Sequence, residues 1–434
     1  MMHRENIMLI STHGYVSAEP ELGLPDTGGQ VVYVLELSKS LARLGHRVDI
    51  YTRQFEDQPQ EEKVTDLVRI IRIPCGGSEF IPKEHMCDYI PEWVENAKRH
   101  IRHNNLSYDV INSHYWDAGL AGEKMAEHLD IPHVHTPHSL GAWKQKNMEG
   151  DPDELEKLYN FSTRIREERS IYNHCHALVA TSPSQRTILA EGTDYDLNPD
   201  KIHVIPPGYD DTRFFPVSDA ERQAMKNDYG YEGRIVLALG RMAKNKGYDL
   251  LLRAMPFVFE RLDDVKLLLA TGSKHPDEEE NQQFEELKSI ARELGILDRV
   301  IFRHYIPDEE LAEHYWLADV FALCSRYEPF GMTAVESMAC GTPTVITTQG
   351  GMWQEVTWGL EAVYADPFDY ESFGHAIYAI LALPRVGQQL EKYGPQKARA
   401  KYTWIGIAQQ FLMLLNRTVF ESGNTLKHPP NHSA

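Results

Sequence analysis

Two carboxylates, Glu328 and Glu336, lie eight positions apart, around an apolar loop and the start of a short predicted helix. The Phe-Gly turn between them should open that helix, which leaves the backbone N–H groups of Gly331, Met332 and Thr333 unpaired at its N-terminus. A helix end of this kind attracts phosphate. A carboxylate can accept two hydrogen bonds from a vicinal diol, so Glu336 suits a ribose and Glu328 suits a sugar ring. The segment therefore predicts a nucleotide-sugar site.

A basic turn in the same half of the chain offers cations for a diphosphate. Arg241 and Lys246 follow the predicted strand Ile235–Leu239 and are five positions apart in a turn that opens a helix. An arginine can bind a diphosphate with two hydrogen bonds, and both charges would stabilise a nucleoside diphosphate as it leaves the sugar. The alternative interpretation is a basic turn that contacts only water.

A pair of glycines precedes the first long predicted helix. Gly28 and Gly29 follow Asp26 and Thr27, and Gln30 comes next. Paired glycines let a ligand approach the backbone, and the start of the following helix favours an anion. The sequence lacks the GxGxxG and P-loop patterns. A Gly-Gly turn before a helix can also be purely structural.

Polar residues follow two further predicted strands of the first half. His138 follows the strand His133–Thr136 and could donate to a sugar hydroxyl or stabilise developing charge. Tyr115 and Asp117 follow the strand Val110–Ser113 and could hold an acceptor polyol. Each of these side chains could instead serve only in packing.

Three cations of the first half are candidates for a phosphorylated acceptor. Lys83 follows a Gly-Gly turn, and Arg164 and Arg169 lie in the predicted helix Glu154–Tyr172. A sugar phosphate needs two or three such groups. Charged side chains on a helix more commonly face water.

Short apolar runs alternate with longer helical patterns along nearly the whole chain. This alternation predicts parallel sheets covered by helices on both faces. Two prolines and a glycine at positions 206–208 predict a linker, so each half is expected to be a doubly wound α/β domain. We expect an acceptor-binding domain over 1–208 and a nucleotide-sugar-binding domain over 209–403. A helix at about 404–420 is expected to pack back on the first domain, and 422–434 is expected to be a flexible tail.

Composition narrows the class of protein. The chain has 434 residues and a net charge of −20, which argues against nucleic acid and against an anionic membrane surface as partners. It shows no apolar run long enough for a membrane span and no secretory signal. Its five cysteines are dispersed without a CxxC pair, which predicts reduced thiols and a cytoplasmic protein.

With these motifs, the sequence resembles the retaining glycosyltransferases of family 4. That family has the GT-B architecture, in which two Rossmann-like doubly wound parallel-sheet domains face a deep cleft. The family pattern is matched at Glu328–Glu336, Gly240-Arg241, Lys246-Gly247, Ile205–Gly208 and Gly350-Gly351. Within the family, Asp26–Val34, Pro137–Gly141 and Tyr327–Met332 are similar to the sucrose-phosphate synthase group. Val31–Leu37 and Tyr402–Gln409 resemble bacterial mannosylfructose-phosphate synthases in particular.

The resemblance implies roles for individual residues. His138, Arg241, Lys246 and Glu328 are implied as catalytic. The implied donor-binding residues are Gly29, Arg241, Lys246, Glu328, Phe330, Gly331, Met332, Thr333 and Glu336. The implied binding residues for the acceptor, fructose 6-phosphate, are Gly28, Gln30, Lys83, Tyr115, Asp117, Arg164 and Arg169. One departure concerns the loop beside the donor sugar, where Gln354 occupies the family's glutamate position and Glu355 comes one residue late.

The reaction expected from this resemblance moves a hexose from a nucleotide-sugar, with GDP-mannose favoured, to the 2-hydroxyl of fructose 6-phosphate with retention. No metal and no other cofactor is expected to be required, so Mg²⁺ should not be essential. A sugar-phosphate phosphatase is expected to act on the product. The alternatives are a sucrose-phosphate synthase that uses UDP-glucose or ADP-glucose, a nucleotide-sugar epimerase, and a non-catalytic sugar-phosphate sensor.

Overall fold

The chain forms two compact units in a computed structural model that describes residues 5–20, 24–148 and 150–423. The first unit comprises residues 1–181, 185–206 and 405–434, and the second comprises 182–184 and 207–404. The boundary at 206–207 falls within the predicted linker. The tail predicted over 422–434 lies, from residue 424 onward, outside the described residues.

The first unit is built on one sheet that is parallel except at one edge. Its described strands lie in the order β3-β4-β2-β1-β5-β6-β7-β8, and only β3 runs antiparallel to its neighbour. Parallel strands covered on both faces have no solvated side, and Ile7, Met8, Leu9 and Ile10 are all fully buried. The strands are β1 (Asn6–Ile10), β2 (Arg47–Gln54), β3 (Glu61–Lys63), β4 (Val68–Pro74), β5 (Val110–His114), β6 (His133–Thr136), β7 (Ala177–Ala180) and β8 (Ile202–Val204).

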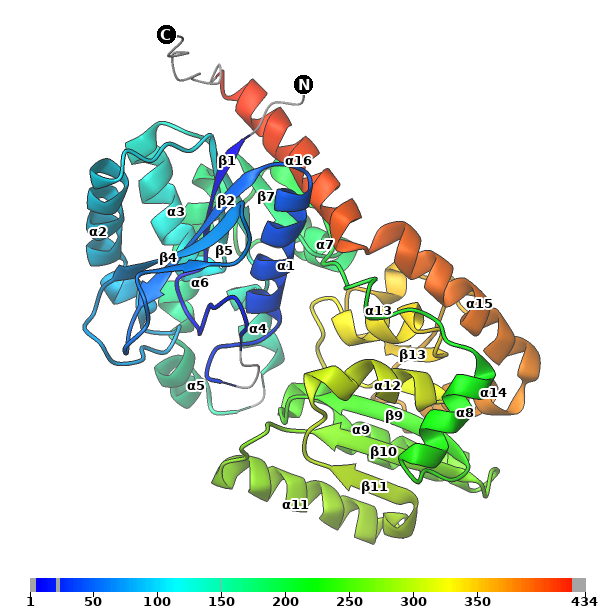
Figure 1. Cartoon of the computed structure of the whole chain (residues 1–434). Helices are drawn as coiled ribbons and strands as arrows, with labels where there is room; N and C mark the ends of the chain where they lie inside the picture. Colours follow the sequence, from blue (N-terminus) through cyan, green and yellow to red (C-terminus); the bar gives the residue numbers. More distant parts are fainter. Residues whose placement is uncertain (1–4, 21–23, 149, 424–434) are drawn as a thin grey trace. The chain divides into compact units, whose positions relative to one another are not determined.

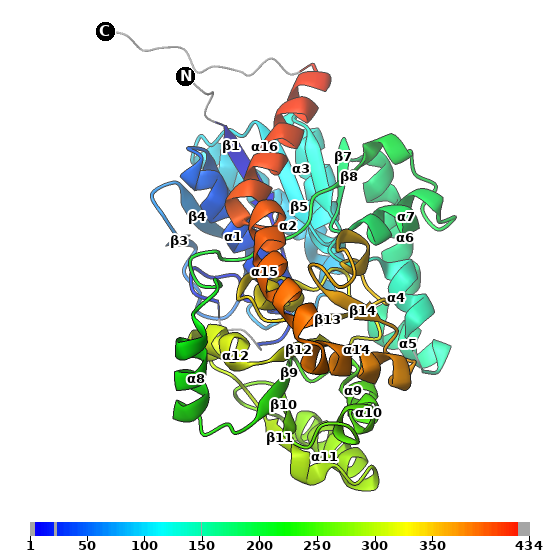
Figure 2. The same cartoon turned by 90° about the vertical axis from the view of Figure 1, so that its right-hand side faces the viewer.

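Helices cover both faces of this sheet. One core joins α2 and α3 to the strands, and α6 packs against α3 on the same face. On the other face, α16 lies along α1, where the rings of Tyr33 and Phe411 are 6.5 Å apart (Figures 1 and 2). The helices are α1 (Gly29–Arg43), α2 (Ile90–His103), α3 (Trp116–Leu129), α4 (Gly141–Asn147), α5 (Pro152–Tyr159), α6 (Phe161–His174), α7 (Pro183–Glu191) and α16 (Trp404–Glu421).

The structure corrects one predicted helix of this unit. The continuous helix expected over Glu154–Tyr172 is divided into α5 and α6 at Asn160, which adopts the left-handed conformation with φ 50°. Asparagine is one of the few residues that enter this region readily. Arg164 therefore lies in the first turn of a new helix, and its direction is set by α6 alone.

The second unit has a sheet whose described strands are all parallel. Their order is β11-β10-β9-β12-β13-β14. The strands are β9 (Arg234–Gly240), β10 (Val265–Thr271), β11 (Val300–Arg303), β12 (Val320–Leu323), β13 (Thr344–Thr347) and β14 (Val363–Ala365). From β9 the chain first adds strands on one side of the sheet, as β10 and β11, and then on the other side, as β12, β13 and β14. This is the doubly wound pattern that the sequence predicts.

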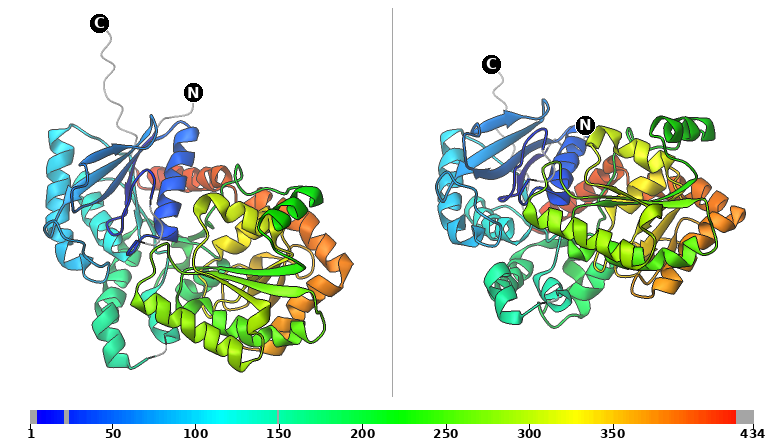
Figure 3. Two further views of the ribbon diagram at one scale, coloured as in Figure 1. Left: turned by 60° about the horizontal axis from the view of Figure 1, so that its bottom comes forward. Right: turned by 90° about the horizontal axis from the view of Figure 1, so that it is seen from below.

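Two cores lie on opposite faces of this second sheet. One contains residues of α9, α10, α11 and α14, and the other contains residues of α12 and α13. Figure 3 shows α11 in yellow-green and α12 in yellow on opposite sides of the sheet. The helices are α8 (Asp219–Asp228), α9 (Tyr248–Ala254), α10 (Pro256–Phe259), α11 (Glu278–Glu293), α12 (Leu311–Leu317), α13 (Met332–Ala339), α14 (Tyr370–Ala382) and α15 (Pro384–Lys401). None of the described helices combines the length and the apolar composition that a membrane span requires.

Candidate active site

The second unit places its basic turn directly after the first strand of its sheet. Arg241 follows β9 and is exposed, and Lys246 ends a short 3-10 turn and is half-buried. Gly247 closes that turn with φ 69°, and a Cβ at this position would come within 2.2 Å of the Cys324 carbonyl oxygen. Only glycine fits this close approach, so the turn that carries Lys246 is fixed against β12.

Glu328 and Lys246 form an ion pair. The Lys246 ammonium lies 2.7 Å from Glu328 Oε2, which also accepts a hydrogen bond from Ser325 Oγ at 3.2 Å. The backbone of Glu328 is fixed as well, because its N–H donates to the Gln349 carbonyl at 3.1 Å. Glu328, which the sequence assigns to the donor sugar, and Lys246, which it assigns to the donor diphosphate, are thus in direct contact.

The start of α13 has the form that the sequence predicts. Gly331 is the N-cap residue, and the amide of Ala334 donates to its carbonyl at 3.0 Å. The amides before Ala334 belong to the first turn, where an α-helix supplies no acceptor. The ring of Phe330 is buried and packs 5.6 Å from Tyr402, so only the main chain of Phe330 could meet a ligand.

Glu336 is half-buried on α13, and Tyr315 donates to its Oε2 at 2.8 Å. Burial raises the pKa of Glu336 to about 7, although the Tyr315 hydroxyl and Arg213 act in the opposite direction. New hydrogen-bond donors stabilise the carboxylate of a buried carboxyl group more than they stabilise that of an exposed one. Arg213 itself is ion-paired with Asp308 at 2.7 Å.

The loop that departs from the family pattern follows β13. Trp353–Glu355 form a short 3-10 turn, and Glu355 makes an ion pair with Lys401 at 2.7 Å. Because Lys401 already binds this carboxylate, Glu355 is not a free substitute for the family's glutamate. Gln354 is the residue left at that position.

In the first unit, Lys83 is fixed by Asp26. The Lys83 N–H donates to Asp26 Oδ2 at 2.9 Å, and the ammonium is ion-paired with both Asp26 and Glu84. Burial alone would lower the pKa of Lys83, but the two carboxylates outweigh it and raise that pKa. Burial would raise the pKa of Asp26, whereas Lys83 holds it below its ordinary value.

Arg164 is fully enclosed in a set of polar contacts. Its guanidinium donates to Glu168 Oε1 at 2.7 Å, to the Tyr115 hydroxyl at 2.8 Å and to the Ser139 carbonyl at 2.9 Å. Its side chain is 3% exposed and that of Glu168 is 1% exposed. The arginine therefore joins the loop after β5 to the loop after β6, as well as carrying charge.

Lys144, on α4, is a cation that sequence reasoning missed. Burial, and then the charges of Arg164 and Lys83, lower the pKa of Lys144 to about 8. Its ammonium lies 4.0 Å from the centre of the Tyr159 ring. Three cations that influence one another in this way favour an anion beside them. We call Lys83, Lys144 and Arg164 the basic cluster.

Arg169 does not join the basic cluster. It is exposed and donates to the Asp194 carbonyl at 2.9 Å. Arg164 and Arg169 are five residues apart on α6, which directs them about 140° apart around the helix axis. The geometry of α6 therefore does not bring together these two arginines, both of which the resemblance implies as acceptor-binding residues.

His138 follows β6 in the left-handed conformation, with φ 61°, and its Nε2 lies 2.9 Å from His114 Nδ1. Burial lowers the pKa of His138 to about 3, so the ring is neutral and could act on a sugar through a hydrogen bond but not as a cation. Two more buried histidines share Ser113, whose Oγ is 2.6 Å from His133 Nε2 and 2.8 Å from His135 Nδ1. We call His114, His133, His135 and His138 the histidine cluster.

Asp117 is placed differently from the prediction. Its side chain is fully buried, and it accepts hydrogen bonds from Thr12 Oγ1 at 2.5 Å and from His13 Nδ1 at 2.9 Å. An acceptor sugar has no exposed carboxylate to reach at Asp117. The geometry favours an indirect role, in which Asp117 orients His13.

The paired glycines and Gln30 lie at the start of α1. Gly28 is the N-cap residue and Gly29 is the first helical residue. Gln30 donates to Ser11 Oγ at 3.2 Å and to the His114 carbonyl at 3.3 Å. Gln30 thereby links the loop after β1 to His114 at the end of β5, the residue before Tyr115.

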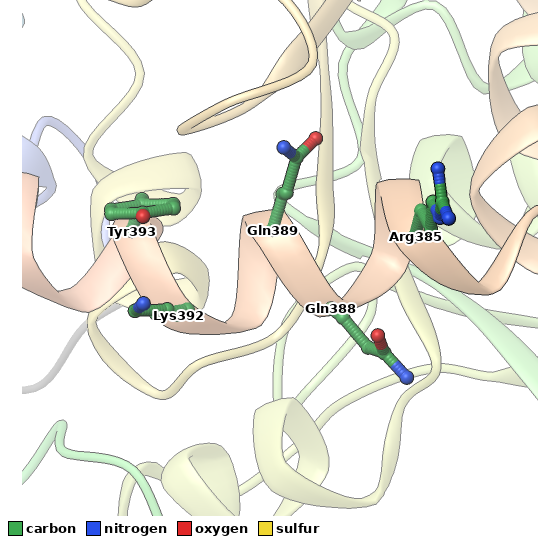
Figure 4. Close-up of a pocket in the computed structure, with 5 residues that line it drawn as sticks. All are labelled: Arg385, Gln388, Gln389, Lys392 and Tyr393. Carbon is green, nitrogen blue, oxygen red and sulfur yellow. The ribbon is translucent and has the colours of Figure 1, made fainter.

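The surface also has a depression whose lining residues are different from the candidate site residues. A shallow depression is lined by five side chains of one helix, α15, namely Arg385, Gln388, Gln389, Lys392 and Tyr393 (Figure 4). Within the described ranges, no three histidine, cysteine, aspartate or glutamate side chains are grouped so that they could hold a metal ion.

Comparisons with known proteins identify the family to which the chain belongs. Residues 27–213 match the family described as Glycosyltransferase Family 4, and residues 220–397 match Glycosyl transferases group 1. The chain is therefore a glycosyltransferase. It is 52% identical to the mannosylfructose-phosphate synthase of Agrobacterium fabrum, over 94% of this chain and 90% of that protein. It belongs to glycosyltransferase family 4, the family that the sequence motifs indicate.

A more distant relative and one solved structure extend the comparison. A D-inositol 3-phosphate glycosyltransferase of Corynebacterium urealyticum is 32% identical over 98% of both chains. The structure of a sucrose-phosphate synthase from Thermosynechococcus elongatus matches 96% of this chain and all of that chain, with a TM-score of 0.82 and 30% identity. These matches confirm the predicted GT-B class with two parallel-sheet α/β domains.

Proposed function

We propose that the protein is a retaining hexosyltransferase that moves a sugar from a nucleotide-sugar, with GDP-mannose favoured, to the 2-hydroxyl of fructose 6-phosphate. The product would be mannosylfructose-phosphate. The basic cluster is the observation that carries the choice of a phosphorylated acceptor. Its three cations come from three different segments of the first unit, the charges of Arg164 and Lys83 lower the pKa of Lys144, and a sugar phosphate needs two or three such groups.

The names of two similar proteins support fructose as the acceptor sugar. The relative at 52% identity is a mannosylfructose-phosphate synthase, and the structure at 30% identity is a sucrose-phosphate synthase. Sucrose is itself a fructoside, so both names describe transfer to a fructose phosphate. The first of them also favours mannose as the transferred sugar.

The second unit supplies a set of groups suited to the donor. Lys246 and the exposed Arg241 would neutralise the diphosphate, and the first turn of α13 would donate backbone hydrogen bonds to it. Glu336 would accept from the ribose hydroxyls. Glu328, which is held by Lys246, would contact the transferred sugar.

In the proposed reaction, the bond between the sugar's anomeric carbon and the donor phosphate oxygen breaks as the nucleoside diphosphate leaves. The acceptor 2-hydroxyl attacks from the same face, and its proton passes to the departing phosphate oxygen. Lys246 and the α13 amides stabilise the charge that develops there. This route retains the configuration without a carboxylate nucleophile, which the two-carboxylate route of a retaining glycosidase needs.

Fixed cations and backbone dipoles perform the charge stabilisation in this proposal, so turnover should not require Mg²⁺ or another cofactor. Initial rates measured with excess EDTA and with added Mg²⁺ would test that expectation, and a loss of most activity in EDTA would refute it. A sugar-phosphate phosphatase is the class of enzyme that we expect to consume the product.

The test of the function is nucleoside diphosphate release from purified protein. GDP-mannose, UDP-glucose and ADP-glucose would each be supplied with fructose 6-phosphate, with unphosphorylated fructose, or with no acceptor. We expect the highest kcat/KM for GDP-mannose with fructose 6-phosphate. A Lys392→Met variant, altered on α15 outside both sets of polar residues, serves as the control.

Other outcomes would select other functions. A preference for UDP-glucose or ADP-glucose would make the protein a sucrose-phosphate synthase, which the 30% identical solved structure favours as the second candidate. Conversion of the nucleotide-sugar without any acceptor would indicate an epimerase. Binding of fructose 6-phosphate without turnover of any donor would indicate a sugar-phosphate sensor.

A further inference from the structure

Arg53, at the end of β2, is a fully buried cation that none of the sequence motifs includes. Its side chain is 2% exposed. Its guanidinium donates to several main-chain carbonyl oxygens of one loop. They belong to Cys75 at 2.9 Å, to Gly76 at 3.5 Å, to Gly77 at 3.0 Å and to Glu79 at 2.8 Å. A buried charge is costly without compensation, and here one loop supplies that compensation.

The loop that surrounds Arg53 directs several of its carbonyl oxygens toward the guanidinium. Gly76 and Gly77 both have positive φ, 63° and 78°, which turns successive carbonyls inward. A Cβ on Gly76 would lie 2.6 Å from the Ile81 side chain, so the turn is packed as well as bent. Carbonyl dipoles that point toward one another repel unless a cation lies between them. Arg53 is that cation.

The rings beside Arg53 fix the far end of the same loop. Its guanidinium lies 5.2 Å from the centre of the Phe55 ring, and the Phe55 and Phe80 rings are 5.8 Å apart in an edge-to-face arrangement. The loop therefore contacts the β2 end at Cys75, at Glu79 and at Phe80. Lys83 of the basic cluster follows three residues later and bonds to Asp26 through both its N–H and its ammonium.

We propose that Arg53 is a positioning residue for the acceptor, and that it acts by holding the 75–79 loop so that Lys83 stays within reach of the acceptor phosphate. This inference rests on the proposed fructose 6-phosphate site. It assigns to Arg53 no contact with substrate. Lysine is not an adequate replacement, because its single ammonium cannot spread donors over four carbonyls as the planar guanidinium does.

The test compares Arg53→Lys and Arg53→Met with Lys83→Met and with the double variant Arg53→Lys/Lys83→Met. Small displacements of a positioned group can cost up to about a hundredfold. We expect Arg53→Lys to raise the KM for fructose 6-phosphate by about tenfold, with the donor KM unchanged and the kcat/KM for unphosphorylated fructose unchanged. If Arg53 acts through Lys83, the double variant should be no worse than Lys83→Met alone.

Arg299→Met is the matched control. Arg299 also donates to carbonyl oxygens, including that of Phe259 at 3.0 Å, but it lies in the second unit. It should lose stability without a change in the KM for fructose 6-phosphate. Additive effects of the Arg53 and Lys83 substitutions, or an equal rise in KM for the Arg299 control, would overturn the proposal.

Amide hydrogen exchange separates this inference from the proposed function. Arg53→Lys should accelerate exchange over residues 75–83 and leave the peptides of the second unit unchanged, whatever the acceptor is. Unchanged exchange in that loop would overturn the positioning role even if the kinetics changed. A parent protein that shows no dependence on fructose 6-phosphate would refute the proposed function, and the exchange comparison would still decide whether Arg53 orders the loop.

Discussion

Replacing Glu336 with glutamine should stabilise the protein while weakening its donor binding. In the folded protein, burial raises the pKa of this carboxyl from 4.5 to about 7. A difference of one pKa unit corresponds to about 1.4 kcal/mol, so the ionised carboxylate costs the fold about 3 kcal/mol at a pH of about 8. Glutamine is isosteric and uncharged, and its oxygen can still accept the Tyr315 hydroxyl.

The sign of the pH dependence follows from the direction of the pKa change. The folded-state pKa of Glu336 lies above the ordinary value, so its contribution to stability is full at low pH and is lost as pH rises through about 7. The advantage of Glu336→Gln should therefore be close to 3 kcal/mol at a pH of about 8 and below about 1 kcal/mol at a pH of about 5. A gain in stability from Glu336→Gln would show that the glutamate is retained for function at a cost in stability.

Urea unfolding of the parent and of Glu336→Gln at these two pH values would measure the difference. Glu286→Gln, at an exposed position on α11, is the matched control and should change stability little at either pH. The donor KM of Glu336→Gln should rise by about tenfold, because an amide offers the ribose one acceptor oxygen instead of two. A variant that is less stable than the parent at the higher pH, or an advantage independent of pH, would refute the reasoning.

Three further outcomes are expected. Lys246→Met should lower kcat by about a hundredfold or more, because the leaving diphosphate loses a fixed cation, and an unchanged kcat in steady-state assays would remove Lys246 from the reaction. Lys144→Met should raise the KM for fructose 6-phosphate by about tenfold and leave that for fructose unchanged, with Lys392→Met as the surface control and equal effects on both sugars as the contrary result. The histidine cluster has pKa values below the ordinary 6.5, so the stability that it contributes is present above that pH and is lost as the pH falls below it. In urea unfolding, stability should therefore fall steadily as the pH drops below 6.5, and a flat profile there would show that the rings are protonated in the folded protein.

The sequence predicted the fold class well because its signals are local. Strand and helix patterns alternate at the residues that form them, and the proline-rich stretch at 206–208 marks a boundary between the two units. Glu328 and Lys246 are in contact, although they are distant in sequence, because both follow the carboxyl ends of neighbouring parallel strands. Topology of this kind can be deduced before any side chain is placed.

The residues that sequence reasoning missed act through tertiary neighbours. Lys144 gains its significance from Arg164 and Lys83, which lie on other segments, and nothing distinguishes it from the nearby Lys146 in the sequence. Asp117 looked like a sugar ligand because its two hydrogen-bond donors, on the loop after β1, cannot be seen from its own motif. Helical periodicity alone separates the side chains of Arg164 and Arg169, so this part of the geometry can be predicted from the sequence.

The last helix determines when the first unit can be completed during synthesis. Ile407, Phe411 and Leu415 of α16 are fully buried, and they belong to the first unit although the whole continuous part of the second unit, 207–404, precedes them in the chain. During synthesis, the second unit is therefore translated before α16 is available to pack against α1. The first unit therefore lacks α16 until translation is nearly complete. Truncation of α16 from its C-terminal end should destabilise the first unit, although that unit is synthesised first.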